Sequence, residues 1–411
     1  MIQAASAAQH LPSAPAVLRL SPLDHAELRW PQHEADEVAA VARILETGRV
    51  NALIHGEQTR AFEAEFAAFC SVPHAIAVSN GTVALELALR ALGVGPGDEV
   101  ILPSRSFFAS AACIVAVGAV PVFADIDPVS NAIDPQSVRR MISPRTRAIL
   151  CVHLAGWPCD MTALRALADE HGLWLVEDCA QAHGATWDRQ PVGSFGDAAA
   201  FSFCTDKIMS TGGEGGMLLL RDEAHWKRGW AYKDHGKSPE KFFSPAPGSG
   251  FRYLHDSFGS NMRMTEMQAA IGRAQLAKLP QWHERRRHNA QLLMDLLHRD
   301  PVVEVPQIPD RVGHAFYRLY VTIAADRLGP NGTAPIIDRM GRMGMPVGSG
   351  SCADMTREDA FAGLPVRRDG NLPQAQDLGR RSIAFPVDHL LDDSDMHRLA
   401  NCLEIALAEL D

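Results

Sequence analysis

The sequence predicts an α/β protein: a large domain with a mostly parallel, mixed sheet flanked by helices, and then a smaller C-terminal α+β domain. Between positions 75 and 220, short apolar runs alternate with helical patterns, which favours a parallel sheet with right-handed crossovers. The run 173–178 is apolar until it ends in two acids, as expected of a strand buried on both faces. From position 301 onward the elements become shorter, which predicts the second domain.

The chain should open with two helices, a strand and a third helix. Positions 35–45 carry apolar residues at helical spacing before Gly48, and positions 60–70 repeat this pattern with phenylalanines that we assign to the core. Residues 74–78 are expected to form a short strand. A helix rich in alanine and leucine should follow over 82–92.

The middle of the chain should supply most of the sheet. Further strands are expected at 100–103, 120–125, 148–152, 173–178, 198–203 and 218–220. One helix should cover 135–141 and another 222–232. A long loop with glycine and proline then spans 234–260, and loops of that length in compact domains are usually functional or mobile.

The last part of the chain predicts a helical connection into the smaller domain. A helix should begin at Thr265 and run to about Leu279, with Pro280 expected to kink or restart it. A charged amphipathic helix should follow over 282–297. The smaller domain should contain a strand at 316–323, a helix at 334–343 and a closing helix at 393–410. These patterns divide the chain into an N-terminal arm (1–30), a large domain (31–280) and a small domain (281–411).

Composition and charge argue against several classes of protein. The chain has 39 Lys and Arg against 49 Asp and Glu, a net charge of −10. Because nucleic-acid binding depends on neutralising phosphates, no nucleic-acid partner is expected. No segment offers the ~20 consecutive apolar residues of a membrane helix, so no membrane partner is expected. The N-terminal residues also lack the pattern of a signal peptide.

The eight cysteines are scattered, without a CxxC pair. This usage favours a reduced, cytoplasmic protein in which Cys113, Cys151 and Cys179 are small buried residues. We weigh a metal site at His153 and Cys159 and set it aside, so no metal is expected.

A lysine and an acid stand at the ends of two predicted strands. Lys207 follows the strand 198–203 and precedes a glycine-rich turn, and Asp178 ends the strand 173–178. A lone loop lysine is usually solvated, but hydroxyl side chains and glycines surround this one. Ligands of open α/β sheets bind beyond the carboxyl ends of the strands. Pyridoxal phosphate takes a lysine as a Schiff base and an aspartate as partner of its ring nitrogen, so this pair predicts that cofactor.

A phosphate site is expected where the helix 82–92 begins. The first amides of a helix have no internal partners and lie at the positive end of its dipole, so they bind anions readily. Gly81 leaves room for a phosphate against the backbone, and Thr82 adds a hydroxyl. A plain helix cap explains these two residues equally well when they are taken alone. Together with Lys207 and Asp178 they favour the phosphate of the same cofactor.

The chain resembles the DegT/DnrJ/StrS family of sugar aminotransferases, which are pyridoxal-phosphate enzymes of fold type I in the aspartate aminotransferase superfamily. The resemblance rests on Glu-Asp-Cys-Ala-Gln-Ala-His-Gly at 177–184, Phe-Ser-Phe at 201–203, and Lys207 before the glycines of 212–216. It extends over most of the chain.

The resemblance implies a role for each candidate residue. Lys207 and Asp178 would be catalytic, and Ser202 would join Gly81 and Thr82 at the phosphate. Phe107 would stack on the cofactor ring, with Phe108 as the fallback. Gln181 would lie beside the ring, although it could instead be a polar surface residue of a following helix.

One further residue is implied to act across a subunit interface. The string Gly-Ser-Asn-Met-Arg-Met at 259–264 resembles a family signature whose asparagine, here Asn261, reaches the phosphate of the partner subunit. The resemblance therefore implies a homodimer with shared active sites. Met262 replaces a tyrosine of that signature.

The implied reaction moves an amino group from an amino acid, with glutamate expected, to a keto group of a nucleotide-linked keto-deoxy sugar. An antibiotic or surface-polysaccharide pathway would use such a product. Two departures concern the substrate: Ala155 stands where relatives often have tyrosine, and the 348–352 segment lacks a histidine that many relatives carry.

Two other functions stay open at this point. A sugar dehydratase of the same fold would have histidine in place of Lys207, so the lysine argues against it. A non-catalytic ligand sensor would not need the complete set of Lys207, Asp178, Gly81 and Thr82.

Overall fold

The computed structural model describes residues 30–245 and 248–408. Except for Trp30, the predicted arm 1–30 lies outside the described residues. No helix in these described ranges is both long enough and apolar enough to cross a membrane.

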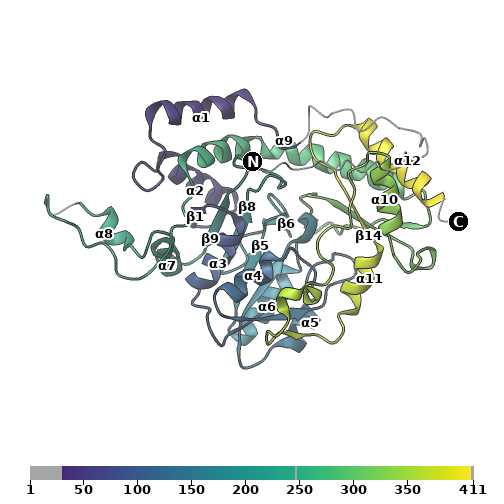
Figure 1. Ribbon diagram of the computed structural model, residues 1–411, viewed down its shortest axis with the longest axis horizontal. Helices are drawn as coiled ribbons and strands as arrows, with labels where there is room; N and C mark the ends of the chain where they lie inside the picture. The colour runs from purple at the N-terminus through teal and green to yellow at the C-terminus, as the bar shows by residue number, and fades with distance from the viewer. Residues whose placement is uncertain (1–29, 246–247, 409–411) are drawn as a thin grey trace, which may run out of the picture.

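The largest sheet is mixed and mostly parallel, as predicted (Figure 1). Its strands in spatial order are β1 (His74–Val78), β9 (Gly216–Leu220), β8 (Ala198–Ser202), β5 (Trp174–Asp178), β4 (Thr146–Val152), β2 (Glu99–Pro103), β3 (Val120–Ala124) and β13 (Arg367–Arg368). Every pair from β8 to β13 is parallel, whereas β9 runs antiparallel to both of its neighbours. The carboxyl ends of β5 and β8 therefore lie at one edge, next to each other.

Helices cover both faces of this sheet because successive strand residues point to opposite sides. One face packs against α3 (Gly81–Ala91), α4 (Ala109–Ala116) and α7 (Glu223–Lys233). The other face packs against α2 (Glu57–Phe69), α5 (Pro135–Met141), α6 (Met161–His171) and α9 (Glu266–Leu297). In β1, for example, Ile76 and Val78 face the first group, while Ala75 and Ala77 face the second.

The first helix, α1 (Ala35–Thr47), ends at Gly48 in a left-handed conformation, as its sequence predicts. It lies along α9 (Figure 1), and Lys278 of α9 pairs with Glu37 of α1 at 2.8 Å. Its apolar stripe is only partly buried, since Val38 and Leu45 are 59% and 57% exposed.

The long helix α9 differs from the prediction. It is one helix of 32 residues with Pro280 inside, not two helices that meet at the proline. An internal proline costs about 3 kcal/mol, and the buried contacts of Leu279 and Trp282 with the core on both sides of it favour the continuous helix.

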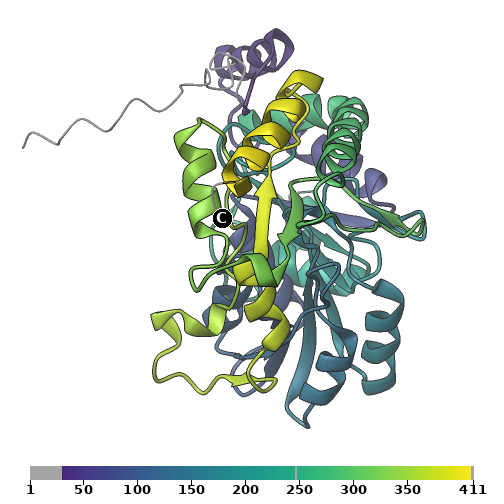
Figure 2. The ribbon, with the colours of Figure 1, turned by 90° about the vertical axis from the view of Figure 1, so that its right-hand side faces the viewer.

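The C-terminal part forms a smaller α+β unit, as predicted (Figure 2). Its antiparallel sheet has the order β10 (Val303–Glu304), β12 (Leu319–Ile323) and β14 (Ser382–Phe385). One core joins this sheet to α10 (Ala334–Arg342), α12 (Asp393–Ala408) and the end of α9. The predicted strand 316–323 is shorter than expected, because Phe316 adopts a left-handed φ of 50° that a strand residue does not take.

Several short elements that were not predicted link the two parts. The short strand β13 pairs with β3 at the edge of the large sheet, and α11 (Pro373–Arg381) follows it. A third sheet joins β11 (Val312–Gly313) to β6 (Thr186–Trp187) and β7 (Gln190–Pro191). The division at residue 280 stays a prediction, since α9 runs through it.

Candidate active site

A cavity of about 900 Å³ lies where the carboxyl ends of β5 and β8 face the C-terminal unit. This volume is typical of small-molecule sites. Segments 317–320 and 346–351 of the C-terminal unit form the opposite wall. The cavity brings together the predicted residues Gly81, Thr82, Phe107, Asp178, Gln181, Ser202 and Lys207.

Lys207 lies on the cavity wall with its amine held by an acid. Its Nζ is 3.1 Å from Oδ2 of Asp206 and 5.3 Å from the centre of the Tyr317 ring. The Tyr317 hydroxyl donates to the same Asp206 oxygen at 2.6 Å. Burial alone would raise the pKa of Asp206, but Lys207 and Tyr317 lower it. An ionised Asp206 thus orients the lysine.

The hydroxyls that flank Lys207 in sequence serve the adjacent turn. Thr205 Oγ1 donates to the Gly213 carbonyl at 3.1 Å, and Ser210 Oγ accepts from the Gly213 N–H at 3.3 Å. Gly212 and Gly213 have φ values of 81° and 120°, which glycine adopts far more readily than other residues. These contacts fold the loop that carries the lysine.

Asp178 ends β5 as a buried carboxyl. Its Oδ2 accepts from the Ser110 hydroxyl at 2.8 Å, and its Oδ1 accepts from the Ala180 N–H at 3.1 Å. Burial raises the pKa of Asp178 although both hydrogen bonds act against that rise. A cation placed in the cavity beside this carboxyl would favour its ionised form, which is what a protonated pyridine nitrogen provides.

The start of α3 forms an anion cradle. Asn80 caps the helix by accepting from the Val83 N–H at 3.0 Å. A methyl group on Gly81 would lie 2.5 Å from Cβ of Ser202, so only glycine allows the helix to begin this close to β8. The other amides of the first turn and the Thr82 hydroxyl remain available for a phosphate.

The two residues predicted beside the cofactor ring also reach the cavity. Phe107 is 65% exposed, so its face is available to a flat ligand. The fallback, Phe108, packs instead against Phe361, with ring centroids 5.5 Å apart. Gln181 accepts from the Ala155 N–H at 2.7 Å, which fixes its amide at the cavity wall.

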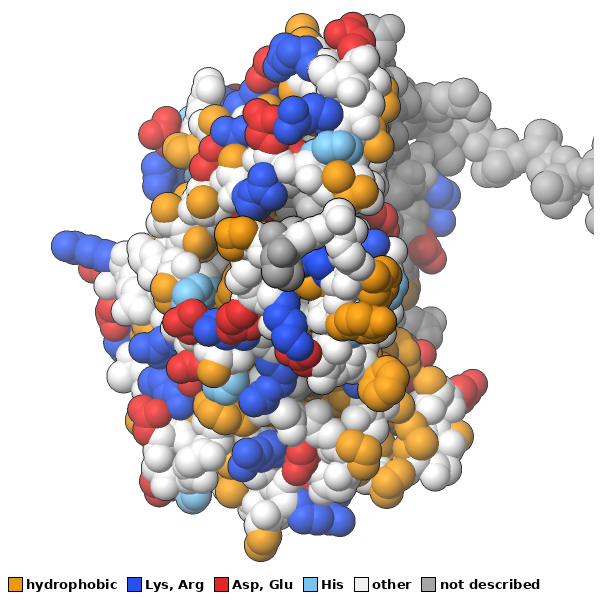
Figure 3. All heavy atoms as spheres, turned by 90° about the vertical axis from the view of Figure 1, so that its left-hand side faces the viewer, with side chains coloured by type: hydrophobic (Ala, Val, Ile, Leu, Met, Phe, Trp, Pro, Cys, Tyr) orange, Lys and Arg blue, Asp and Glu red, His pale blue; other side chains and the backbone are white. Residues whose placement is uncertain are grey.

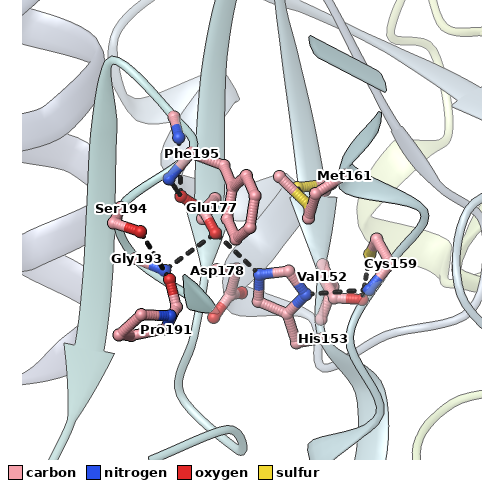
Figure 4. A network of polar contacts seen from close by, with 12 residues as sticks. Val152, His153, Cys159, Met161, Glu177, Asp178, Pro191, Gly193, Ser194 and Phe195 are labelled. Atoms are coloured by element: carbon pink, nitrogen blue, oxygen red, sulfur yellow. Dashed lines mark hydrogen bonds and ion pairs between the residues drawn. The ribbon is translucent and has the colours of Figure 1, made fainter. Parts of the chain in front are cut away.

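A buried network stands behind this site (Figure 4). His153, Glu177 and Cys179 bring potential metal-ligating atoms within 4.8 Å of one another. However, the two nitrogens of His153 contact Glu177 at 3.1 Å and the Cys159 N–H at 3.0 Å. Glu177 also accepts from the N–H groups of Gly193, Phe195 and Gly196. With its donors used in this way, the cluster anchors the end of β5 and leaves Asp178 as the acid facing the cavity.

Asn261 is the one predicted site residue that does not line this cavity. It is exposed, forms an isolated bridge with Asp234, and its side-chain oxygen lies 3.5 Å from the Arg263 nitrogen. Within this chain it therefore does not join the cradle of Gly81 and Ser202.

The 348–352 segment, which the family resemblance placed near the substrate, does reach the cavity with residues 348–351, but sequence reasoning missed the residues around the start of β12. Tyr317, Arg318 and Tyr320 line the cavity, as does Asp206 beside the lysine. The sequence signal for the three C-terminal residues is Tyr-Arg-Leu-Tyr at the start of a predicted strand, where polar groups at a strand end can reach a ligand, and the signal for Asp206 is its place directly before Lys207.

Comparison with known proteins agrees with this geometry. The model of the DegT/DnrJ/EryC1/StrS aminotransferase family matches residues 31–404. The chain is 38% identical over 361 residues to the dTDP-3-amino-3,4,6-trideoxy-alpha-D-glucose transaminase of Streptomyces venezuelae, covering 87% of this chain and 88% of the relative. It is 39% identical over 292 residues to the UDP-N-acetyl-3-dehydro-alpha-D-glucosamine 3-aminotransferase of Acidithiobacillus ferrooxidans, covering 71% and 74%.

A solved structure shares this architecture over most of the chain. The aminotransferase from Psychrobacter cryohalolentis superposes with a TM-score of 0.89 at 42% identity, covering 93% of this chain and 99% of that one. From the match over residues 31–404, this similarity and the lysine–aspartate cavity, we conclude that the chain belongs to the DegT/DnrJ/EryC1/StrS family of pyridoxal-phosphate-dependent sugar aminotransferases.

Proposed function

We propose that the protein transfers an amino group from an amino acid, with glutamate expected, to the keto group of a nucleotide-linked keto-deoxy sugar. The observation that carries this proposal is that Lys207, Asp178 and the start of α3 line one cavity. The two relatives named above, a dTDP-sugar and a UDP-sugar aminotransferase by name, support a nucleotide-linked acceptor.

The residues of the cavity fit pyridoxal phosphate. Gly81, Thr82 and Ser202 would hold its phosphate, and Phe107 and Gln181 would flank its ring. Asp178 would bind the protonated ring nitrogen. Burial raises the pKa of Asp178, and the positive charge of the ring nitrogen would oppose this rise and keep the carboxyl ionised. When bound, this cofactor accepts the electron pair that is left on carbon after a proton is removed.

Lys207 has two tasks in this proposal. Its amine attaches the resting cofactor to the protein. Once released, the Lys207 amine at the cavity wall would remove and return the proton at the α-carbon of the donor, while the bound cofactor would supply the electron sink. Asp206 and Tyr317, which hold the amine and its acid partner, position it for both tasks. The lysine also argues against the dehydratase alternative.

A visible absorption spectrum tests the proposed function. We expect the purified protein to be yellow, with a band at about 400–430 nm from the lysine-bound cofactor. Adding glutamate alone should remove this band, and adding a nucleotide-linked keto sugar afterwards should restore it. A band that glutamate and other amino acids leave unchanged would contradict amino transfer and support the ligand-sensor alternative.

Replacing Asp178 by asparagine should preserve the shape of the site and remove its charge. We expect the cofactor to bind more weakly and kcat to fall by at least ~10²-fold, the size of a lost electrostatic contribution. Cofactor titration and kcat, measured separately on Asp178→Asn, distinguish these effects. A near-normal kcat would mean that the ring nitrogen does not depend on Asp178. Glu177 is not expected to replace Asp178 in this role, because it already accepts from three backbone N–H groups.

We further propose that the protein acts as a homodimer with shared active sites. Helix α8 (Pro239–Phe243) and the segment after it extend from the body of the molecule (Figure 1). Their exposed aromatic side chains are Phe243, Phe251, Tyr253 and Phe258, and Figure 3 shows the side of the molecule from which α8 extends. A contiguous exposed apolar patch marks an interaction surface, and a second copy seated on these side chains would also bring its Asn261.

A cytoplasmic location is proposed from the thiol chemistry. All eight cysteines are free, and most of them are buried. Thiols in this state are typical of a reducing compartment.

A further inference from the structure

Arg318 is a cavity-lining cation without an acidic partner. It lies just before β12 on the wall that the C-terminal unit forms, is half-buried, and lines the same cavity as Lys207. No hydrogen bond or ion pair of its side chain occurs within residues 30–245 and 248–408; its guanidinium carbon only lies 5.6 Å from the centre of the Tyr317 ring. Other arginines of the C-terminal unit do have acids, as Arg311 has Asp188 and Arg381 has Asp377.

Arg105 adds a second uncompensated cation behind this wall. It is completely buried, and its guanidinium lies 5.3 Å from the centre of the Tyr320 ring. It donates to neutral groups only: Asn131 Oδ1 at 2.9 Å, Ser382 Oγ at 3.2 Å and the Ser349 carbonyl at 3.4 Å. Its Nε has no acceptor in the described structure.

Arg286 of α9 is the third cation at this wall. It is buried and donates to the Phe316 carbonyl at 3.0 Å. Burial lowers the pKa of Arg286 to about 10, and the charge of Arg318 contributes to the lowering, although Asp388 opposes it. The segment 316–320 is thus contacted by two buried arginines and presents a third to the cavity.

The acids of the cavity do not neutralise this wall. Asp206 is paired with Lys207 and Tyr317. Asp178 is bound by Ser110, and Glu214 lies 3.7 Å from the Cys204 thiol. Because opposite charges attract more strongly where water is excluded, the wall around Arg318 favours an anionic group of a substrate.

We propose that Arg318 binds an oxyanion of a substrate: a carboxylate of the amino donor or a phosphate of the nucleotide. This inference rests on the proposed function, because both anions belong to its substrates. The planar guanidinium donates two parallel N–H groups to either anion. Arg318 is then a specificity-determining residue that places one charged end of a substrate against the C-terminal unit, away from the phosphate cradle of the cofactor.

Binding of unreactive probes to the cofactor-loaded protein tests this assignment. Glutarate represents the carboxylates of the donor, because it has no amino or keto group and cannot react, and dTDP represents the nucleotide. Their Kd values are measured by titration calorimetry for the wild type, Arg318→Gln, Arg318→Lys and Arg299→Gln. Arg299 is the matched control, since it is exposed just after α9 and does not line the cavity.

We expect Arg318→Gln to raise the Kd of one probe by about 10- to 100-fold, the range for a hydrogen bond to a charged group. Arg318→Lys should lie between this variant and the wild type, because it keeps the charge and loses the paired geometry. Arg299→Gln should leave both values unchanged. A selective effect on glutarate assigns the donor carboxylate, and a selective effect on dTDP assigns the nucleotide phosphate.

Other outcomes overturn the assignment. It fails if both Kd values are unchanged in Arg318→Gln, or if the wild type binds neither probe. Thermal unfolding shows whether each variant is folded, and the visible band shows whether it has bound the cofactor. If Arg318→Gln fails either test, the Kd values of Arg318→Lys are compared with those of the wild type instead, and unchanged values overturn the assignment. Since the probes need no turnover, a wild type that binds one of them through Arg318 but aminates no sugar overturns the proposed function and not this inference.

Discussion

Replacing Lys207 by alanine is expected to abolish multiple turnover. On the proposed function the variant would lose both the amine that attaches the cofactor and the base that moves the proton, and a positioned base alone typically contributes about 10²–10⁴-fold. No other lysine is among the described residues that line the cavity, so no neighbouring amine is expected to substitute. The visible band at about 400–430 nm should disappear with the activity.

Lys207→Arg is the matched control for charge. Its guanidinium can keep the ion pair with Asp206, so the fold of the loop should be retained. It stays protonated and cannot act as an amine nucleophile, so this variant should also be inactive and colourless at that band. Steady-state kinetics and spectra of both variants provide the measurement. Normal turnover by either one would show that Lys207 is not the attachment residue.

The gathering of Asp178, Lys207 and Gly81 in one cavity could be predicted because each residue follows a local signal. Asp178 and Lys207 stand at the ends of buried strands, and parallel strands of one sheet present their carboxyl ends at a common edge. Gly81 precedes a strong helix that begins against β8. In these cases the chain segment itself contains the information that positions the side chain.

The opposite wall of the cavity could not be predicted in this way. Tyr317 and Arg318 reach the site from a unit whose packing against the large sheet no local pattern describes. Arg105 is a comparable case. It follows β2 and donates to Asn131 and to the Ser349 carbonyl. Nothing in the sequence around it indicates that its guanidinium is buried with no acidic partner among the groups it contacts. Side chains brought together across two folding units depend on tertiary packing, which periodicity does not report.

The fold departs from prediction for the same reason. Pro280 is a valid stop signal on local grounds, but packing of α9 on both sides of the proline outweighs it. The strand β13 is two residues long and forms only because β3 offers a free edge. Neither result could be read from the residues concerned.

The second large effect is expected from mixing two inactive variants. Asn261→Asp would place a carboxylate next to the cofactor phosphate if Asn261 acts across a dimer interface, and like-charge repulsion should then loosen the cofactor. Lys207→Ala lacks the residue that we propose attaches the cofactor. Each variant alone should have almost no activity, because every site in its dimer contains a lesion.

Subunit exchange between the two variants should restore activity. In an equal mixture about half of the dimers contain one subunit of each kind, and a two-fold interface gives each dimer two equivalent composite sites. One site of a mixed dimer then has both lesions, while the other has an intact Lys207 and an intact Asn261 from its partner. Activity should therefore rise to about a quarter of the wild-type value by this count of sites.

The structure makes this outcome specific to Asn261. The residue is exposed and does not line the cavity of its own chain, whereas Gly81 and Ser202 contact each other within it. If Asn261 instead served its own chain, every site in every mixture would keep one lesion. Exchange is verified independently, with differently tagged subunits recovered in one dimer. Exchange without recovery of activity would exclude the shared site, and Asn261 would then serve only its contacts with Asp234 and Arg263.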